Sequence, residues 1–249
     1  MDAAFYFDLA SPQAYLAAER ILHELPGPVE WQPVLARDLA GAPTPQASAP
    51  RASAPRAWAP QSWAPQASAQ QTRAAIERQA SALGLQPLRW PDRFPFDSER
   101  AMLAATYAKS IGRTVPFAQA AFRQAFAGGR DLEQLDWVLI AAAACEMHPQ
   151  AVLRGLELRS VRDRLTANTS AAAAAGVREV PAVRIGRRVF AGAQALENAR
   201  RAQRTAADID DQKNEKSDRR DRADLKMEIL HRPCGERRGV GKRPKGDIR

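Results

Sequence analysis

The chain has 249 residues, carries a net charge of +9 at pH 7 and contains 45% hydrophobic residues. A chain of this length can form one large domain or two small ones, and its hydrophobic content excludes global disorder. The positive charge alone raises the question of nucleic-acid binding. No zinc-finger spacing, RNP-like aromatic strand or helix with a continuous basic stripe accompanies it, so we do not expect nucleic acid to be a partner.

Targeting, membrane and metal signals are missing from the sequence. Residues 1–10 lack a basic region followed by a long apolar run, and the alanine-rich run 141–145 is too short to span a membrane. Cys145 and Cys234 lie far apart, without metal-ligand spacing, and predict neither a disulfide nor a metal site. His148 precedes Pro149, where a capping or exposed role is expected. We therefore expect a cytoplasmic protein with no metal and no membrane partner.

A strand, a helix and a second strand open the chain. Residues 3–9 alternate aromatic with small or acidic side chains, a pattern typical of a strand in a core sheet. Apolar residues then recur at helical spacing over 12–25, and Ser11 is placed to cap this helix. After a break at Gly27, residues 29–34 are predicted to form a second strand. This β-α-β unit favours the α/β class with a parallel pair of strands.

Residues 42–71 have a different composition and repeat a five-residue unit, with copies such as ASAPR and AWAPQ. Proline in most copies forbids a regular helix or central strand, and Ala and Ser offer little surface to bury. The segment is predicted to be a mobile, partly polyproline-II insert. In one interpretation, Trp58 and Trp63 contact a partner or fold over a pocket. In the other, the repeat is an expansion without a function that is tolerated in a surface loop.

Helical periodicity dominates the next hundred residues and predicts an all-helical insert within the α/β unit. The predicted helices cover 73–83, 98–112, 117–127, 132–145, 149–159 and 160–175.

A β-hairpin that contains a proline follows. Residues 180–185 and 189–190 are predicted to be its strands, with a turn at Gly186. Pro181 falls inside the first strand, where an ordinary ladder does not tolerate proline. We therefore expect a cis Val180–Pro181 peptide bond whose backbone faces a site.

Three segments together resemble a known family: FYFDLASPQAYLA at 5–17, LRWPDRFPFDSERAM at 88–102 and GVREVPAVRIGRRVFAGAQAL at 176–196. The chain from Ala3 to about Arg201 is similar to the DsbA-like thioredoxin superfamily. Within it, the resemblance is to the 2-hydroxychromene-2-carboxylate isomerases and the related kappa-class glutathione transferases.

The resemblance implies an α/β protein with a thioredoxin-like fold (β-α-β … β-β-α) that is interrupted by an all-helical insert domain. A final short helix is predicted over 194–203. The predicted parts are 1–40 and 176–204 for the thioredoxin-like domain, 41–71 for the disordered repeat insert, 72–175 for the helical insert and 205–249 for a charged disordered tail.

The resemblance also implies a function for Ser11. Ser11 and Ala14 occupy the positions of the two redox cysteines, and the family binds glutathione at the domain junction, with the serine hydroxyl on its sulfur. A hydrogen bond to the thiolate at a helix N-terminus lowers the pKa of the thiol. The thiolate then adds to a conjugated carbon of a small aromatic carboxylate, allows bond rotation and leaves. A plain helix N-cap is the alternative role for Ser11.

Further glutathione and substrate contacts follow from the resemblance. Val180 and Pro181 match the cis-proline segment, where the valine backbone pairs with the cysteine backbone of glutathione; an edge strand is the alternative. Phe96 matches a position on the substrate side, which apolar packing explains equally well. In the family, one segment binds the amino end of glutathione through an acidic residue. In this chain the matching segment is Gly192, Ala193 and Gln194. The neutral amide of Gln194 still accepts a hydrogen bond, although a charge-assisted contact is the stronger.

The predicted function is that of a glutathione-dependent isomerase, with a kappa-like glutathione transferase and a non-catalytic thioredoxin-fold binding protein as alternatives. Disulfide exchange is excluded at this corner because neither Ser11 nor Ala14 can form a mixed disulfide. Family members are often dimers, so the resemblance also implies a homodimer.

Overall fold

A parallel pair of strands forms the centre of the fold, as the sequence predicts. The computed structural model describes residues 2–39 and 66–205. Strands β1 (Ala3–Phe7) and β2 (Val29–Pro33) run parallel, in a register that pairs Ala3 with Val29 and Phe7 with Pro33. All five residues of β1 are buried, which indicates that both faces of this strand are covered.

The predicted hairpin completes a mixed sheet. Strand β3 (Ala182–Ile185) pairs antiparallel with β1 on one side and with β4 (Arg188–Ala191) on the other, so the sheet order is β2-β1-β3-β4. Strand β3 begins two residues later than predicted, because Pro181 has no N–H to contribute to the ladder. The proline therefore precedes the strand.

The first predicted helix is divided into two. Helix α1 (Pro12–Ala18) ends before Arg20, and a short helix α2 (Ile21–Glu24) follows. A further short helix that the sequence did not indicate, α3 (Ala36–Leu39), comes directly after β2.

Six helices make up the predicted helical insert. Helix α4 (Gln66–Ala82) begins inside the segment predicted as disordered, because the sequence contains no proline between Pro65 and Pro87 to block it. The rest of the predicted repeat insert, residues 42–65, lies outside the described residues. The other five helices are α5 (Glu99–Ser110), α6 (Thr114–Phe126), α7 (Leu135–Ala143), α8 (Pro149–Glu157) and α9 (Arg159–Ala174).

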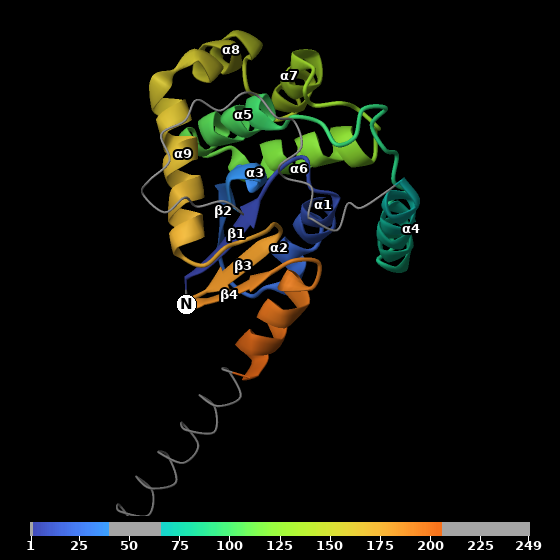
Figure 1. Ribbon diagram of the computed structural model, residues 1–249. Helices are drawn as coiled ribbons and strands as arrows, with labels where there is room; N and C mark the ends of the chain where they lie inside the picture. The colour runs from blue at the N-terminus through green and yellow to red at the C-terminus, as the bar shows by residue number, and fades with distance from the viewer. Residues whose placement is uncertain (1, 40–65, 206–249) are drawn as a thin grey trace, which may run out of the picture. The chain divides into compact units, whose positions relative to one another are not determined.

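The two faces of β1 contact different hydrophobic clusters. Phe5 and Phe7 belong to the larger cluster, which continues into the helical insert, whereas Ala4 and Tyr6 pack with residues near the end of α9. Figure 1 shows α5 to α8 gathered above the sheet and α9 running along the side of β2. Strand alternation thus places the sheet between two helical layers.

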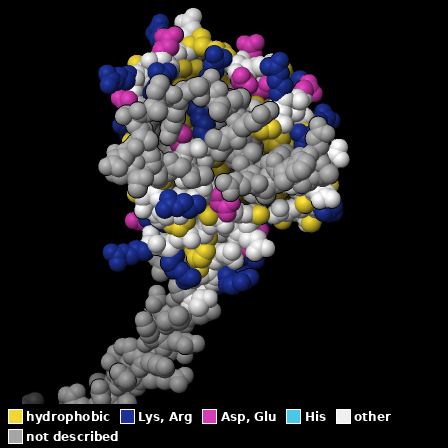
Figure 2. All heavy atoms as spheres, in the orientation of Figure 1, with side chains coloured by type: hydrophobic (Ala, Val, Ile, Leu, Met, Phe, Trp, Pro, Cys, Tyr) yellow, Lys and Arg dark blue, Asp and Glu magenta, His cyan; other side chains and the backbone are white. Residues whose placement is uncertain are grey.

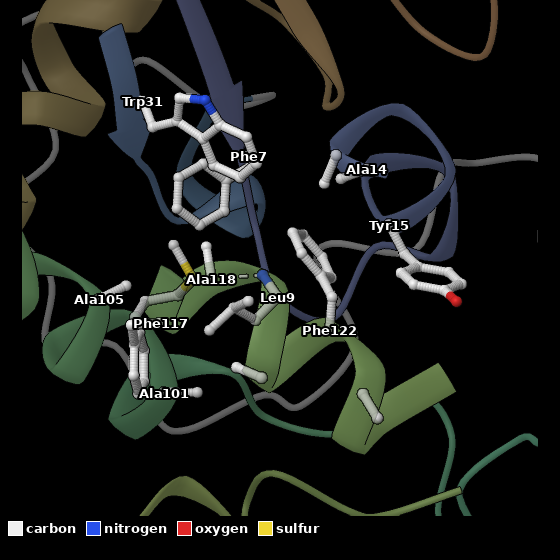
Figure 3. Close-up of a cluster of buried hydrophobic side chains, with 14 of the residues drawn as sticks. Phe7, Leu9, Ala14, Tyr15, Trp31, Ala101, Ala105, Phe117, Ala118 and Phe122 are labelled. Atoms are coloured by element: carbon white, nitrogen blue, oxygen red, sulfur yellow. Dashed lines mark hydrogen bonds between the residues drawn. The ribbon is translucent and has the colours of Figure 1, made fainter. Parts of the chain in front are cut away.

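The sheet and the helical insert share one core. In Figure 3 Phe7 and Leu9, at the end of β1, face Phe117, Ala118 and Phe122 of α6. The ring centroids of Phe7 and Phe122 are 5.9 Å apart. Residues Met1–Gln203 accordingly form one compact unit.

The C-terminal helix covers residues 195–205. Arg20 bonds Glu197 of this helix at 2.7 Å and also Glu24 at 2.7 Å, which ties the helix to the α1–α2 region. Residues Arg204–Arg249 form a second unit, and the predicted tail lies outside the described residues beyond Thr205.

Charged side chains are spread over the visible surface. Figure 2 shows basic and acidic side chains interspersed over the helices in its upper part. None of the helices in the described part of the chain is long and apolar enough to cross a membrane.

Candidate functional site

The sheet register brings the predicted site segments to one end of the sheet. Because β1 and β3 are antiparallel and Tyr6 pairs with Ala182, the chain leaves β1 toward Ser11 at the end where Pro181 enters β3. Ala191, the last residue of β4, pairs with Ala182 at this same end, and Gly192 follows it. Strand alignment therefore gathers three segments that lie far apart in the sequence.

Ser11 caps α1, as the sequence predicts. Its backbone is extended, and its Oγ accepts a hydrogen bond from the Ala14 N–H at 3.2 Å. Its own N–H donates to the Asp8 carbonyl at 3.0 Å. Ser11 is buried, and among the described residues no acceptor receives its hydroxyl hydrogen. The hydroxyl is thus positioned by an accepted bond while its donor capacity remains available.

Asp8 is a part of the site that sequence reasoning missed. Its carboxylate is buried beneath the corner and accepts hydrogen bonds from the Ala10 and Ala36 N–H groups, both at 2.9 Å. The Ser98 hydroxyl also bonds it. Asp8 thereby joins the loop after β1 to the loop after β2 and to the start of α5. An acidic residue directly after an otherwise apolar strand is the sequence feature that could have identified Asp8 as part of the site.

Burial controls the ionisation of Asp8. Loss of hydration raises the pKa of this carboxyl above its ordinary value, while the bonds from Ala10, Ala36 and Ser98 and the charge of Arg37 act in the opposite direction. Arg37 is itself paired with Asp97 and Glu99 on the outer side.

The Val180–Pro181 peptide bond is cis, as predicted. Val180 is 9% exposed, and its N–H and C=O form no backbone hydrogen bond among the described residues. The Pro181 carbonyl accepts the Gly192 N–H at 2.9 Å. The peptide groups of Val180 therefore lie next to Pro181, whose carbonyl is held by Gly192.

Gly192 is required by the turn in which it lies. Its φ is +82°, and a Cβ added there would approach Glu179 Oε1 to 2.6 Å. Ala193 and Gln194 follow and are exposed. The structure places these three residues beside Pro181 and leaves the Gln194 amide accessible.

Phe96 lies in the loop before α5. It is 2% exposed and packs against Phe94, with ring centroids 6.3 Å apart. Its position fits the apolar-packing alternative. The neighbouring Phe94–Pro95 bond is also cis, which the sequence analysis did not predict.

Thiol and metal chemistry have no support in the described part of the chain. Cys145 lies in a turn after α7 rather than inside a helix; it is free and buried, and burial raises the pKa of its thiol. In residues 2–39 and 66–205 no group of three His, Cys, Asp or Glu side chains could hold a metal ion. His148 caps α8 by accepting the Gln150 N–H at 3.2 Å, as predicted.

The mixed sheet, the helical insert and the cis-proline beside a strand-to-helix corner define a thioredoxin-like protein. Residues 4–203 match the DSBA-like thioredoxin domain family, and the chain belongs to that family. The predicted recognition and fold class are thereby confirmed. No curated protein matches the chain.

Solved structures agree on the fold. A 2-hydroxychromene-2-carboxylate isomerase is 19% identical, with a TM-score of 0.68 over 84% of this chain and 99% of that one. A probable DsbA oxidoreductase from Streptomyces coelicolor is 22% identical, with a TM-score of 0.62 over 81% and 88%. The cytosolic disulfide reductase DsbM from Pseudomonas aeruginosa, solved with GSH, is 13% identical, with a TM-score of 0.55 over 83% and 99%. At these identities the similarity shows the fold alone.

Proposed function

We propose that the protein is a glutathione-dependent isomerase similar to 2-hydroxychromene-2-carboxylate isomerase. The observation that carries the proposal is the convergence of a serine hydroxyl with free donor capacity and an open backbone segment at one end of the sheet. A thioredoxin fold that uses its own thiol needs a cysteine at this corner, and Ser11 replaces it. The site is therefore suited to a thiol that the ligand brings.

Val180 is suited to hold the peptide backbone of glutathione. Val180 lies two residues before β3, and its N–H and C=O have no backbone partner among the described residues, so it can bind an extended peptide by adding backbone hydrogen bonds. The accessible Gln194 amide is placed to bond a polar end of the same ligand. The structural neighbour that contains GSH gives independent support for this choice of thiol.

Ser11 would then stabilise the glutathione thiolate by donating its hydroxyl hydrogen. Helix α1 has only seven residues, so the hydroxyl rather than the helix dipole is the main contributor. In a 2-hydroxychromene-2-carboxylate the ring C–O bond of the hemiketal breaks first, the hydroxyl proton passes to the phenol oxygen, and a ketone forms. The thiolate sulfur then forms a bond to a conjugated carbon of this ring-opened cis form, and the displaced π electrons move to the carbonyl oxygen. After rotation about the new single bond these electrons return, the C–S bond breaks and the thiolate is released. The cycle needs no oxidant, reductant or external base.

The test is the pKa of bound glutathione in the parent and in Ser11→Ala. We expect the substitution to raise the thiol pKa by about 1 to 2 units, because a hydrogen bond to a charged group contributes about 1.5–3 kcal/mol. Calorimetry measures binding, and the ultraviolet absorbance of the thiolate measures its pKa.

Two controls show whether the effect belongs to the hydroxyl at this position. Ser11→Thr keeps a hydroxyl and should restore the low thiol pKa, and Ser160→Ala removes an exposed hydroxyl and should change nothing. Absence of saturable binding to the parent at millimolar glutathione would refute the glutathione proposal. An unchanged thiol pKa in Ser11→Ala would remove Ser11 from the mechanism.

A non-catalytic binding protein is the second candidate, and the cap bond of Ser11 favours it. The Oγ already accepts the Ala14 N–H, which a purely structural serine would also do. Glutathione binding without conversion of a 2-hydroxychromene-2-carboxylate to its ring-opened trans isomer would support this candidate over the isomerase.

A further inference from the structure

Arg73, near the start of α4, is a half-buried cation held over two aromatic rings. Its guanidinium carbon lies 5.1 Å from the centroid of the Trp90 ring and 5.6 Å from that of Phe94. One terminal nitrogen reaches the Phe94 carbonyl at 3.4 Å, which is a long hydrogen bond. The Nε atom is buried and has no hydrogen-bond partner in residues 2–39 and 66–205. The guanidinium is therefore oriented by the rings but poorly satisfied in hydrogen bonding.

Arg73 also has no ion-pair partner among the residues that the structure describes. Glu77, four residues later on the same helix, is in the position of an ion-pair partner, but it accepts the Trp90 indole N–H at 2.6 Å. No carboxylate in the described part of the chain lies within 4.0 Å of Arg73. Half-buried cations elsewhere in the described residues have a carboxylate partner, as Arg20, Arg37, Lys109 and Arg200 do. Arg184 has no such partner but is satisfied by hydrogen bonds to the Tyr6 hydroxyl and the Gly186 carbonyl. A fixed and unpaired guanidinium is the arrangement that binds a planar anion in a bidentate fashion.

Aromatic surface surrounds this cation. The ring centroids of Trp90 and Phe94 are 5.0 Å apart, both side chains are half-buried, and each contacts Phe126 edge-on. Phe126 itself is fully buried. Phe126 stacks on Tyr15 at 5.7 Å, and Tyr15 lies in α1 one helical turn after Ser11. The cation thus stands at one end of an aromatic cluster whose other end belongs to the helix that Ser11 caps. An anion attached to an aromatic group matches the guanidinium and the partly exposed edges of the Trp90 and Phe94 rings.

We propose that Arg73, oriented by Trp90 and Phe94, binds the carboxylate of an aromatic acid and selects this class of substrate. The inference rests on the proposed function for its choice of an aromatic acid. Glutathione also carries carboxylates, so the experiment distinguishes binding of a substrate carboxylate from binding of a glutathione carboxylate.

The test titrates the full chain with cinnamate, with the neutral cinnamamide and with glutathione, each alone. We expect the parent to bind cinnamate more tightly than cinnamamide, and Arg73→Gln to weaken cinnamate by about tenfold without changing the amide. Arg78→Gln removes an exposed charge from the same helix and should leave all three affinities unchanged. Arg73→Lys keeps the positive charge but loses the two parallel N–H donors of the guanidinium, so it should retain part of the cinnamate affinity. Thermal unfolding of each variant checks that the fold is retained.

The outcomes distinguish this inference from the proposed function. Equal binding of cinnamate by the parent and Arg73→Gln overturns the inference, and Ser11-dependent glutathione binding would still stand. Loss of glutathione affinity in Arg73→Gln, with cinnamate unchanged, also overturns it, because the carboxylate would then be that of glutathione. Arg73-dependent cinnamate binding without any glutathione binding supports the carboxylate site and refutes the isomerase.

Discussion

Replacement of Asp8 by alanine should lower the free energy of unfolding by about 3 kcal/mol. The substitution leaves the N–H groups of Ala10 and Ala36 and the hydroxyl of Ser98 without their shared acceptor. Each unsatisfied buried polar group costs about 1–3 kcal/mol. Part of this cost is offset because the variant no longer has to bury a carboxylate. Urea denaturation measures the change. Asp92→Ala, at an exposed acid in the loop before α5, is the control and should change stability by less than about 0.5 kcal/mol.

The cost of substituting Asp8 should also depend on pH. Burial raises the pKa of Asp8 in the folded state, so the folded protein retains this proton more strongly than the unfolded chain. The contribution of Asp8 to stability is then largest at about pH 4 and falls as pH rises through the raised pKa. We expect Asp8→Asn, which cannot titrate, to cost more stability at about pH 4 than at about pH 7. A cost that stays constant or rises with pH would contradict the raised pKa.

Replacement of Phe122 by alanine should lower the free energy of unfolding by about 3–5 kcal/mol. Phe122 is fully buried and contacts Phe7 of β1 at 5.9 Å and Tyr15 of α1 at 6.2 Å (Figure 3). A cavity here removes contacts between the helical insert and the sheet at the same time.

Phe122→Ala also tests whether the two predicted domains fold together. Because they share one core, we expect a single unfolding transition that shifts as a whole. Leu22→Ala, at a side chain that is 46% exposed, should have a much smaller effect. Two separate transitions, with only one of them shifted, would show that the insert is an independent folding unit.

Local patterns were sufficient to predict much of the fold. Alternation in β1 predicts a strand with two distinct faces, and the structure packs Phe5 and Phe7 against one cluster and Tyr6 against the other. The serine before Pro12 predicts a helix cap, which the Ala14 N–H completes. These predictions held because they depend on residues within one turn or one strand.

Long-range contacts were not predictable in the same way. Arg73 and Glu77 are four residues apart on one helix, yet the Glu77 carboxylate accepts the indole N–H of Trp90, thirteen residues away. Asp8 and Ala36 are 28 residues apart, and only the parallel pairing of β1 with β2 brings them together. The choice of partner for a polar group is decided by tertiary proximity, which propensity and spacing do not contain.

The sequence by itself determined the parallel pair of strands, the cap at Ser11 and the cis bond before Pro181, because hydrophobic alternation, capping and proline sterics act locally. Only the tertiary structure decided that the Ser11 and Pro181 segments share one end of the sheet and that a buried carboxylate supports the corner. It also decided that Glu77 bonds Trp90 and not Arg73. Strand register, burial and charge pairing join segments from distant parts of the chain, so their outcome depends on the complete fold.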